Sequence, residues 1–275
     1  MSEPQPAPTR APVTVPTVRA AKRRDGHAPL VMVTAYDAPG ARVADAAEVD
    51  MILVGDSVAN VVLGYEDTLQ VTIADMAHHV AAVARAKPRP LIVGDLPWMS
   101  YHVDAADTVR NGAALIRAGA QCVKLEGGAV RAPMVEALVA AEIPVMGHIG
   151  LTPQSVNALG GFKVQGKGDE AARSLVEAAR ILESAGCFAI VVEAVPEKVG
   201  TAVTEAIEVP TIGIGAGPEC DGQVLVMHDL LGMSGRTPKF VRRYAELELA
   251  AIEAVATYAA DVRSGAFPAD REAYH

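Results

Sequence analysis

Eight short apolar segments alternate with longer helical patterns along this chain, and this alternation is its strongest constraint on the fold. The segments are rich in apolar and β-branched residues and end on glycine or polar residues, which is typical of buried parallel strands. Their predicted bounds are 29–37, 51–57, 90–97, 122–128, 144–150, 188–196, 210–217 and 224–229. A chain of 275 residues is long enough to close eight such units into one (β/α)8 barrel.

An open doubly wound sheet is the alternative for alternating strands and helices. Its usual mark, GxGxxG directly after the first strand, is missing, and the glycine-rich run at 213–217 comes only near the end of the chain. We therefore predict an α/β TIM barrel, formed as a single domain by residues 17–275. Residues 1–16 are rich in Pro, Ala and Thr without an apolar run, which predicts a disordered N-terminal segment.

Composition and charge argue against several classes of function. The net charge is −9, aromatic residues make up only 4%, and the one basic run, Lys22–Arg24, is short, so no nucleic acid partner is expected. Cys122, Cys187 and Cys220 form no metal-binding pattern, which is typical of reduced thiols in a cytoplasmic enzyme. We expect neither a signal peptide nor a membrane-spanning segment.

The stretch 122–128, CVKLEGG, places two opposite charges on one face of a predicted strand. Successive side chains of a strand point to opposite faces, so Lys124 and Glu126 lie on the same side. Both faces of a parallel strand are covered, and charges that face inward there need partners. A solvent-exposed Lys–Glu pair is the alternative. We favour an inward pair because polar residues end other predicted strands in the same way.

Acidic residues lie near the ends of three neighbouring predicted strands, with Asp56 on the second, Asp95 on the third and Glu126 on the fourth. The carboxyl ends of the strands form the active site of a TIM barrel. Three carboxylates there repel one another unless a cation lies between them, and oxygen-only ligands favour Mg²⁺ over zinc. Loop capping by Asp56 and Asp95 is the alternative. We predict a Mg²⁺ site, with Lys124 beside it to bind a substrate carboxylate.

Two further polar residues lie at predicted strand ends. Glu193 is surrounded in sequence by apolar residues, and the resulting desolvation suits a general base. A buried glutamate satisfied by backbone donors is the alternative. His148 either hydrogen-bonds to the substrate or only packs, and the sequence does not choose between these roles. The glycine-rich segment 151–168 is long for a βα connection, which predicts an active-site lid.

Several short motifs, in this order along the chain, closely resemble those of the ketopantoate hydroxymethyltransferase family of the pantothenate pathway. They are VGDS at 54–57, DLP at 95–97, VKLEGG at 123–128, GHIGLTPQS at 147–155, GGFKVQG at 160–166, GIGAG at 213–217 and VMHD at 226–229. The resemblance runs from about Thr17 to the last residue. Only the Pro/Ala-rich segment before it departs from the family pattern.

This resemblance implies a (β/α)8 enzyme that transfers a hydroxymethyl group from 5,10-methylenetetrahydrofolate to 3-methyl-2-oxobutanoate, with Mg²⁺, to form 2-dehydropantoate. It also implies a homo-oligomer, often a decamer. The residue roles implied by the family match are metal binding by Asp56 and Asp95 with Glu126 beside them, substrate contact by Ser57, Asp95 and Lys124, and proton removal by Glu193. We add Asp56 and His148 to the expected substrate contacts.

Two alternatives to this function remain open at the level of sequence. One is a Mg²⁺-dependent lyase or mutase of the isocitrate lyase and phosphoenolpyruvate mutase type, although the KKCGH loop of the former is absent from the chain. The other is a noncatalytic barrel that binds a metabolite and keeps its acidic residues for stability.

Overall fold

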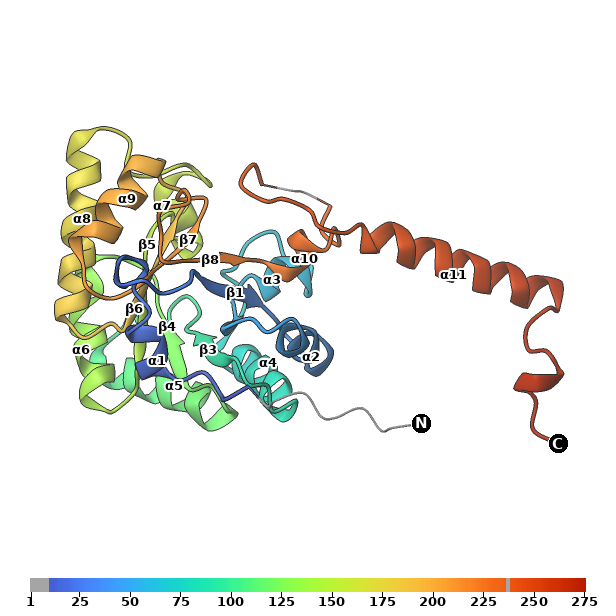
Figure 1. Ribbon diagram of the computed structural model, residues 1–275. Helices are drawn as coiled ribbons and strands as arrows, with labels where there is room; N and C mark the ends of the chain where they lie inside the picture. Colours follow the sequence, from blue (N-terminus) through green and yellow to red (C-terminus); the bar gives the residue numbers. More distant parts are fainter. Residues whose placement is uncertain (1–9, 236–237) are drawn as a thin grey trace. The chain divides into compact units, whose positions relative to one another are not determined.

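The computed structural model describes residues 10–235 and 238–275, and the chain divides into two compact units, Met1–Val226 and Met227–His275. In the first unit eight parallel strands close into a barrel, in which each strand pairs with the next and β8 pairs with β1 (Figure 1). The strands are β1 Leu30–Thr34, β2 Met51–Val54, β3 Leu91–Asp95, β4 Cys122–Lys124, β5 Val145–Gly150, β6 Ala189–Glu193, β7 Thr211–Ile214 and β8 Gly222–Leu225. The predicted (β/α)8 fold is confirmed.

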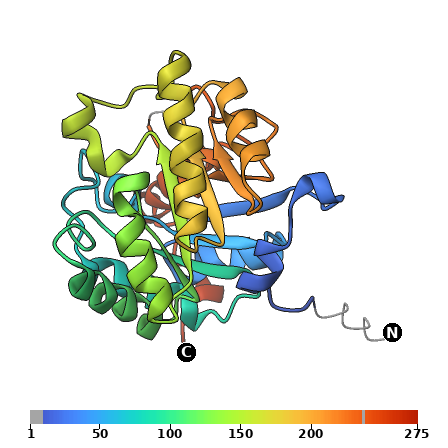
Figure 2. The same cartoon turned by 90° about the vertical axis from the view of Figure 1, so that its left-hand side faces the viewer.

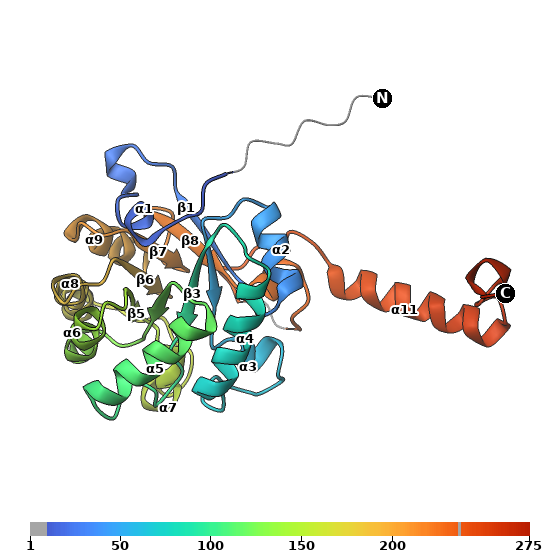
Figure 3. The ribbon, with the colours of Figure 1, turned by 90° about the horizontal axis from the view of Figure 1, so that it is seen from below.

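Helices surround this barrel, and Figure 3 shows them around the ring of strands. They are α1 Val15–Arg19, η1 Arg23–Asp25, α2 Ala38–Ala46, α3 Val58–Val61, α4 Ile73–Arg85, α5 Ala105–Ala118, η2 Ala129–Arg131, α6 Ala132–Ala140, η3 Pro153–Ser155, α7 Val156–Leu159, α8 Asp169–Ser184 and α9 Glu197–Ala206. Figures 1 and 2 both show α6 and α8 side by side on the outside. Residues 215–221 join β7 to β8 without a helix.

Two helices begin at caps formed by polar side chains. The Asp37 carboxylate accepts the Gly40 backbone N–H at 2.7 Å and caps α2. Thr72 and Asp75 form a complete capping box at the start of α4, in which each side chain accepts the other residue's backbone N–H.

Alternate positions of the strands point into the barrel, and their first inward residues form one apolar cluster. Leu30 and Met32 of β1, Met51 of β2 and Leu91 of β3 belong to it and are at most 8% exposed. Val13, Val18 and Ala21, which precede the first strand, pack into the same cluster. The N-terminal segment and α1 therefore close the amino end of the barrel with apolar surface.

Polar contacts hold this N-terminal segment in place. Arg10 forms an ion pair with Asp50, with Nη2 and Oδ1 2.6 Å apart, and the Val13 N–H donates to the Arg89 carbonyl at 2.9 Å. Residues 1–9 of the predicted disordered segment lie outside the described residues. Residues 10–16 are packed on the barrel instead, because the spaced valines around the prolines bury apolar surface that the composition of the segment does not reveal.

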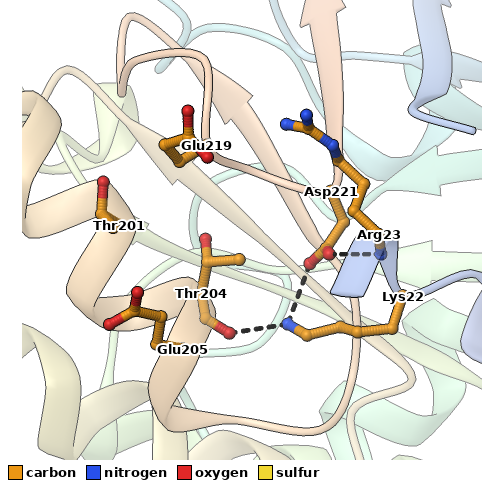
Figure 4. Close-up of a pocket in the computed structure, with 7 residues that line it drawn as sticks. All are labelled: Lys22, Arg23, Thr201, Thr204, Glu205, Glu219 and Asp221. Carbon is orange, nitrogen blue, oxygen red and sulfur yellow. Dashed lines mark hydrogen bonds and ion pairs between the residues drawn. The ribbon is translucent and has the colours of Figure 1, made fainter. Parts of the chain in front are cut away.

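Lys22 fixes the end of this segment to two other parts of the barrel. Its buried Nζ donates to Asp221 Oδ2 at 2.9 Å, to the Thr204 carbonyl at 2.7 Å and to the Val209 carbonyl at 3.2 Å, and Figure 4 shows the first two of these contacts. Lys22, Thr204 and Asp221 border a pocket of ≈ 290 Å³. The three donors of Lys22 are all satisfied, so its role in this pocket is structural.

The second unit contains α10 Met227–Leu230, α11 Leu247–Ser264 and η4 Asp270–Glu272. One sequence prediction is wrong here: the eighth strand ends at Leu225, and residues 227–229, predicted as its continuation, belong to α10. Before α11 begins, the Tyr244 and Leu247 N–H groups donate to the Leu230 and Leu231 carbonyls. Among the described helices of the chain, none is long and apolar enough to cross a membrane.

The closure of the barrel by α1 predicts a stability effect at Val18, whose side chain is fully buried. Val18→Ala should lower the free energy of unfolding by about 2 kcal/mol, because it removes two buried methyl groups and leaves a cavity. The control Val130→Ala, at a position that is 75% exposed, should change it by about 0.5 kcal/mol or less. Denaturant unfolding checks this, and equal effects of the two substitutions would contradict the proposed packing.

Candidate active site

Polar side chains form the carboxyl end of the barrel interior. Most of them follow an apolar-cluster residue of the same strand by two or four positions and therefore point to the same side, whereas Asp56 comes two residues after the end of β2. Strand register brings them together, because Asp95 lies opposite Lys124 in the β3–β4 pair and Gly150 lies opposite Glu193 in the β5–β6 pair. The residues that share this end are Asp56, Asp95, Lys124, Glu126, His148 and Glu193.

Lys124 is the buried cation of the site. Its Nζ lies 2.6 Å from Asp95 Oδ1 and 3.6 Å from Glu126 Oε1, and the residue is only 3% exposed. Burial alone lowers the pKa of Lys124, but the negative charges of Asp95 and Glu126 outweigh burial and raise this pKa above its usual range. Lys124 therefore carries a fixed positive charge at neutral pH.

Asp56 and Asp95 crowd together beside this cation. The Asp56 backbone N–H donates to Asp95 Oδ2 at 3.2 Å, and the two side chains are 5% and 1% exposed. Burial, together with the charges of Asp95 and Glu126, raises the pKa of Asp56 well above its usual range. Burial also raises the pKa of Asp95, against the opposing effect of Lys124. The site therefore holds more negative charge than its own cations balance.

His148 lies between two glutamates. Its Nδ1 is 3.4 Å from Glu126 Oε1, and its Nε2 is 3.3 Å from Glu193 Oε2. Burial lowers the pKa of His148, but the charge of Glu126 outweighs this and raises the pKa to about 9. Burial likewise opposes ionisation of Glu126, yet the charges of His148 and Lys124 give it a lowered pKa. His148 is thus a charged member of the site and more than a packing residue.

Glu193 ends β6 with its side chain 15% exposed, which makes it more accessible than Lys124 or Glu126. The neighbouring strand approaches it closely at Gly150, where a Cβ atom would stand 2.2 Å from the Glu193 carbonyl oxygen. Gly150 also has a φ of +94°, so glycine is required there for two reasons. The Leu151 N–H donates to the same carbonyl at 2.9 Å and fixes the strand end that carries the Glu193 side chain.

Ser57 follows Asp56 and lies at the start of α3. Its Oγ is 2.9 Å from the hydroxyl of Tyr36, which is buried at the end of β1. The Tyr36 carbonyl in turn lies 2.8 Å from His79 Nδ1. Ser57, a predicted substrate contact, therefore directly follows Asp56, and its hydroxyl is hydrogen-bonded to the Tyr36 hydroxyl.

Two residues of the site were not predicted from the sequence, Gln154 and Tyr101. Gln154 Nε2 donates to Asp56 Oδ2 at 3.0 Å, and its backbone N–H donates to Glu126 Oε2 at 3.1 Å. The Tyr101 hydroxyl donates to Gln154 Oε1 at 2.6 Å. The sequence signal for Gln154 was its place in the motif at 147–155, directly after the proline that begins the 3-10 turn η3.

The donor set of the site suits a hard cation. Asp56, Asp95 and Glu126 offer only oxygen atoms, and their negative charge is in surplus. In the part of the chain that the structure describes, no group of three or more His, Cys, Asp or Glu side chains is placed to hold a metal ion by itself. Mg²⁺ commonly binds through one or two carboxylates and keeps its other positions for water and substrate. The residues fit such an open site, and the predicted ligand set stays a prediction.

Comparison with known proteins identifies a family for the chain. The family model described as ketopantoate hydroxymethyltransferase matches residues 12–270. A 3-methyl-2-oxobutanoate hydroxymethyltransferase from Methylobacterium sp. (strain 4-46) is 57% identical over 262 residues, which is 95% of this chain and 90% of that protein. The same name is given to a protein from Pyrobaculum calidifontis that is 54% identical over 92% of this chain and 95% of its own length.

Solved structures share the fold at low sequence identity. A 2,3-dimethylmalate lyase of the PEP mutase/isocitrate lyase superfamily has a TM-score of 0.61 and 18% identity, over 95% of this chain and 92% of that chain. A phosphonopyruvate hydrolase, solved with oxalate and Mg²⁺, has a TM-score of 0.60 and 14% identity, over 94% and 93%. At this identity the likeness supports the barrel fold alone.

The surplus negative charge predicts that Asp56→Asn stabilises the metal-free protein, by about 1–2 kcal/mol at pH 8. In the wild type, the raised pKa of Asp56 means that the folded protein binds a proton at this residue more tightly than the unfolded protein does. Ionisation of Asp56 therefore lowers the free energy of unfolding of the wild type as the pH rises above about 4. The gain should vanish near pH 3, where both states are protonated. Glu142→Gln, at an exposed position, is the control. If denaturant unfolding at about pH 8 gives the wild type and Asp56→Asn the same free energy of unfolding, the prediction is wrong.

Proposed function

Because this chain belongs to the ketopantoate hydroxymethyltransferase family, we propose that it transfers a hydroxymethyl group from 5,10-methylenetetrahydrofolate to 3-methyl-2-oxobutanoate and forms 2-dehydropantoate. The family and its transferase activity rest on relatives more than 50% identical over nearly the whole chain. The site observation that carries the proposal is the buried Lys124 among the carboxylates at the barrel mouth, with the more accessible Glu193 at the end of β6.

Lys124 and its neighbours suit an oxoacid. The substrate brings a carboxylate and a keto oxygen, and Lys124 offers a permanent positive charge to them. Ser57 follows Asp56 in the chain, and Asp95 accepts the Asp56 backbone N–H. Both are proposed polar contacts of the substrate, with His148 at the Glu193 side. The exclusion of water at this buried end strengthens each of these contacts.

Glu193 is the proposed general base. It takes the proton from C3 of 3-methyl-2-oxobutanoate, which leaves an enolate whose oxygen faces the cationic side of the site. Water breaks the two C–N bonds of the methylene group of 5,10-methylenetetrahydrofolate, which releases tetrahydrofolate and a one-carbon unit at the oxidation level of formaldehyde. The enolate carbon then adds to the carbon of this unit, and the oxygen of the unit takes up the proton that Glu193 removed and becomes the new hydroxyl group. His148, 3.3 Å from Glu193, orients this carboxylate.

Asp56 and Asp95 are the proposed Mg²⁺ ligands, with Glu126 beside them. When bound, Mg²⁺ would supply the positive charge that stabilises the enolate. The proposal is supported by the buried surplus of carboxylate charge, which needs a cation. The phosphonopyruvate hydrolase that shares this fold was solved together with Mg²⁺, so a barrel of this kind is compatible with the cation.

We further propose that the protein is a cytoplasmic homo-oligomer, with a decamer as the expected size. In the second unit, α11 has no buried residue, and its exposed apolar side chains include Leu249, Ile252, Val255 and Tyr258, each more than half exposed. An apolar surface of this kind is typical of a subunit contact. Light scattering at several protein concentrations gives the subunit number directly.

Loss of a proposed metal ligand should weaken Mg²⁺ binding. Asp95→Ala removes one oxygen ligand and leaves Lys124 without its closest partner, so we expect at least a tenfold loss of Mg²⁺ affinity, measured by titration calorimetry. The exposed Glu197→Gln should bind Mg²⁺ like the wild type. Equal affinity in Asp95→Ala and wild type would refute the assignment of this ligand.

Loss of the proposed base should slow proton removal. With Mg²⁺ and no folate, the wild type should exchange the C3 proton of 3-methyl-2-oxobutanoate with deuterated water, as followed by proton NMR. Glu193→Gln should slow this exchange and the overall turnover by roughly 10²- to 10⁴-fold while the oxoacid still binds. Lys124→Ala should instead weaken oxoacid binding. If Glu193→Gln exchanges the C3 proton at the wild-type rate, Glu193 is not the base, and His148 is the next candidate for this role.

A further inference from the structure

Gln154 is buried although it belongs to the loop after β5. It lies in η3 Pro153–Ser155, at the base of the predicted lid 151–168, and it is only 4% exposed. In contrast, Phe162 and Val164 further along this segment are 57% and 45% exposed. The segment thus has an exposed tip and a base that is anchored inside the acidic site.

The anchor reaches the ends of three strands. Gln154 Nε2 donates to Asp56 Oδ2 after β2 and to the Leu96 carbonyl after β3, both at 3.0 Å. Its backbone N–H donates to Glu126 Oε2 after β4 at 3.1 Å. One loop residue therefore supplies donors to two of the three buried carboxylates.

Tyr101 fixes the orientation of the Gln154 amide. The Tyr101 hydroxyl accepts the Glu126 backbone N–H at 3.2 Å, so its own proton points to Gln154 Oε1, 2.6 Å away. Because Oε1 faces Tyr101, the amide NH2 group must face the two acceptors Asp56 Oδ2 and the Leu96 carbonyl oxygen. Each hydrogen bond of this network has only one possible donor and one possible acceptor, so the Gln154 amide has one stable orientation.

The network leaves one oxygen of Asp56 for a ligand. Gln154 uses Oδ2, and among the described residues no hydrogen bond or ion pair reaches Asp56 Oδ1. A carboxylate that is held through one oxygen presents the other in a fixed direction, as ligands of bound metal ions commonly do through their outer partners.

We propose that Gln154, fixed by Tyr101, is a positioning residue that orients Asp56 toward a divalent cation and couples occupation of the site to ordering of the segment 151–168. The proposal rests on the proposed function, because it takes Asp56 as a cation ligand. Gln154 does not touch the reacting atoms. It acts through the carboxylate that it holds.

The experiment compares Gln154→Ala and Tyr101→Phe with the control Gln165→Ala, in the full-length protein. Gln165 belongs to the same segment, but its amide donates to the Lys163 carbonyl at the surface and not to the acidic site. Mg²⁺ affinity is measured by calorimetry with the metal alone. Hydrogen exchange of the peptides that cover 151–168 is measured with and without Mg²⁺, and thermal unfolding confirms that each variant is folded.

We expect Gln154→Ala to bind Mg²⁺ about 10- to 100-fold more weakly, and Tyr101→Phe to do so by a smaller factor, because it removes only the hydroxyl that orients the amide. Mg²⁺ should slow exchange in 151–168 of the wild type and of Gln165→Ala but not of Gln154→Ala. Saturating Mg²⁺ should restore much of kcat in Tyr101→Phe, as is expected for a residue that acts through a ligand.

Two outcomes would overturn the proposal. If the folded Gln154→Ala and Tyr101→Phe variants bind Mg²⁺ as tightly as the wild type, Gln154 is only a packing residue, and the proposed function stands. If Mg²⁺ slows exchange in 151–168 equally in Gln154→Ala and Gln165→Ala, the coupling to the segment is wrong. A wild type that binds no Mg²⁺ would instead refute the metal site itself, and with it this inference.

Discussion

The arrangement of the site follows from the burial of several carboxylates against too few cations. Asp56, Asp95 and Glu126 are each at most 5% exposed, and Lys124 and His148 are their only buried partners of opposite charge in the described chain. A buried charge without a partner costs several kcal/mol, so such a cluster is kept where a ligand balances it. Burial, together with the neighbouring carboxylates, raises the pKa of Asp56 and of Asp95 above the usual range of an aspartate.

The rest of the barrel supports this cluster by being apolar and rigid. The strands that end in Asp95, Lys124 and Glu193 begin with Leu91, Cys122 and Ala189, all part of the apolar cluster that α1 closes at the other end. Hydrophobic burial at the amino end therefore supplies stability that the carboxyl end loses by burying charge. The separation of the two roles along single strands is a general property of this fold.

The sequence predicted where the charged residues gather because they lie at or just after strand ends, and alternation along the strand sets the direction of several of them. Lys124 and Glu126 share a face for this reason, and Asp56 and Asp95 close neighbouring strands. Gln154 and Tyr101 escaped prediction because they come from loops, where no periodicity relates sequence position to direction. The ordered start of the chain was missed for a different reason. Val13 and Val18 bury apolar surface only because the open end of the barrel lies next to them, and composition does not report such tertiary contacts.

The central claim is that the surplus charge at the barrel mouth is balanced by a divalent cation that the oxoacid meets there. Mn²⁺ replaces Mg²⁺ at oxygen sites and scatters X-rays anomalously. The most direct measurement is therefore anomalous diffraction from crystals grown with Mn²⁺ and 3-methyl-2-oxobutanoate. The account predicts one strong anomalous peak beside Asp56 and Asp95, with the oxoacid within reach of Lys124 and Glu193. An oxoacid bound at this site without any anomalous peak, or a peak remote from both aspartates, would contradict it.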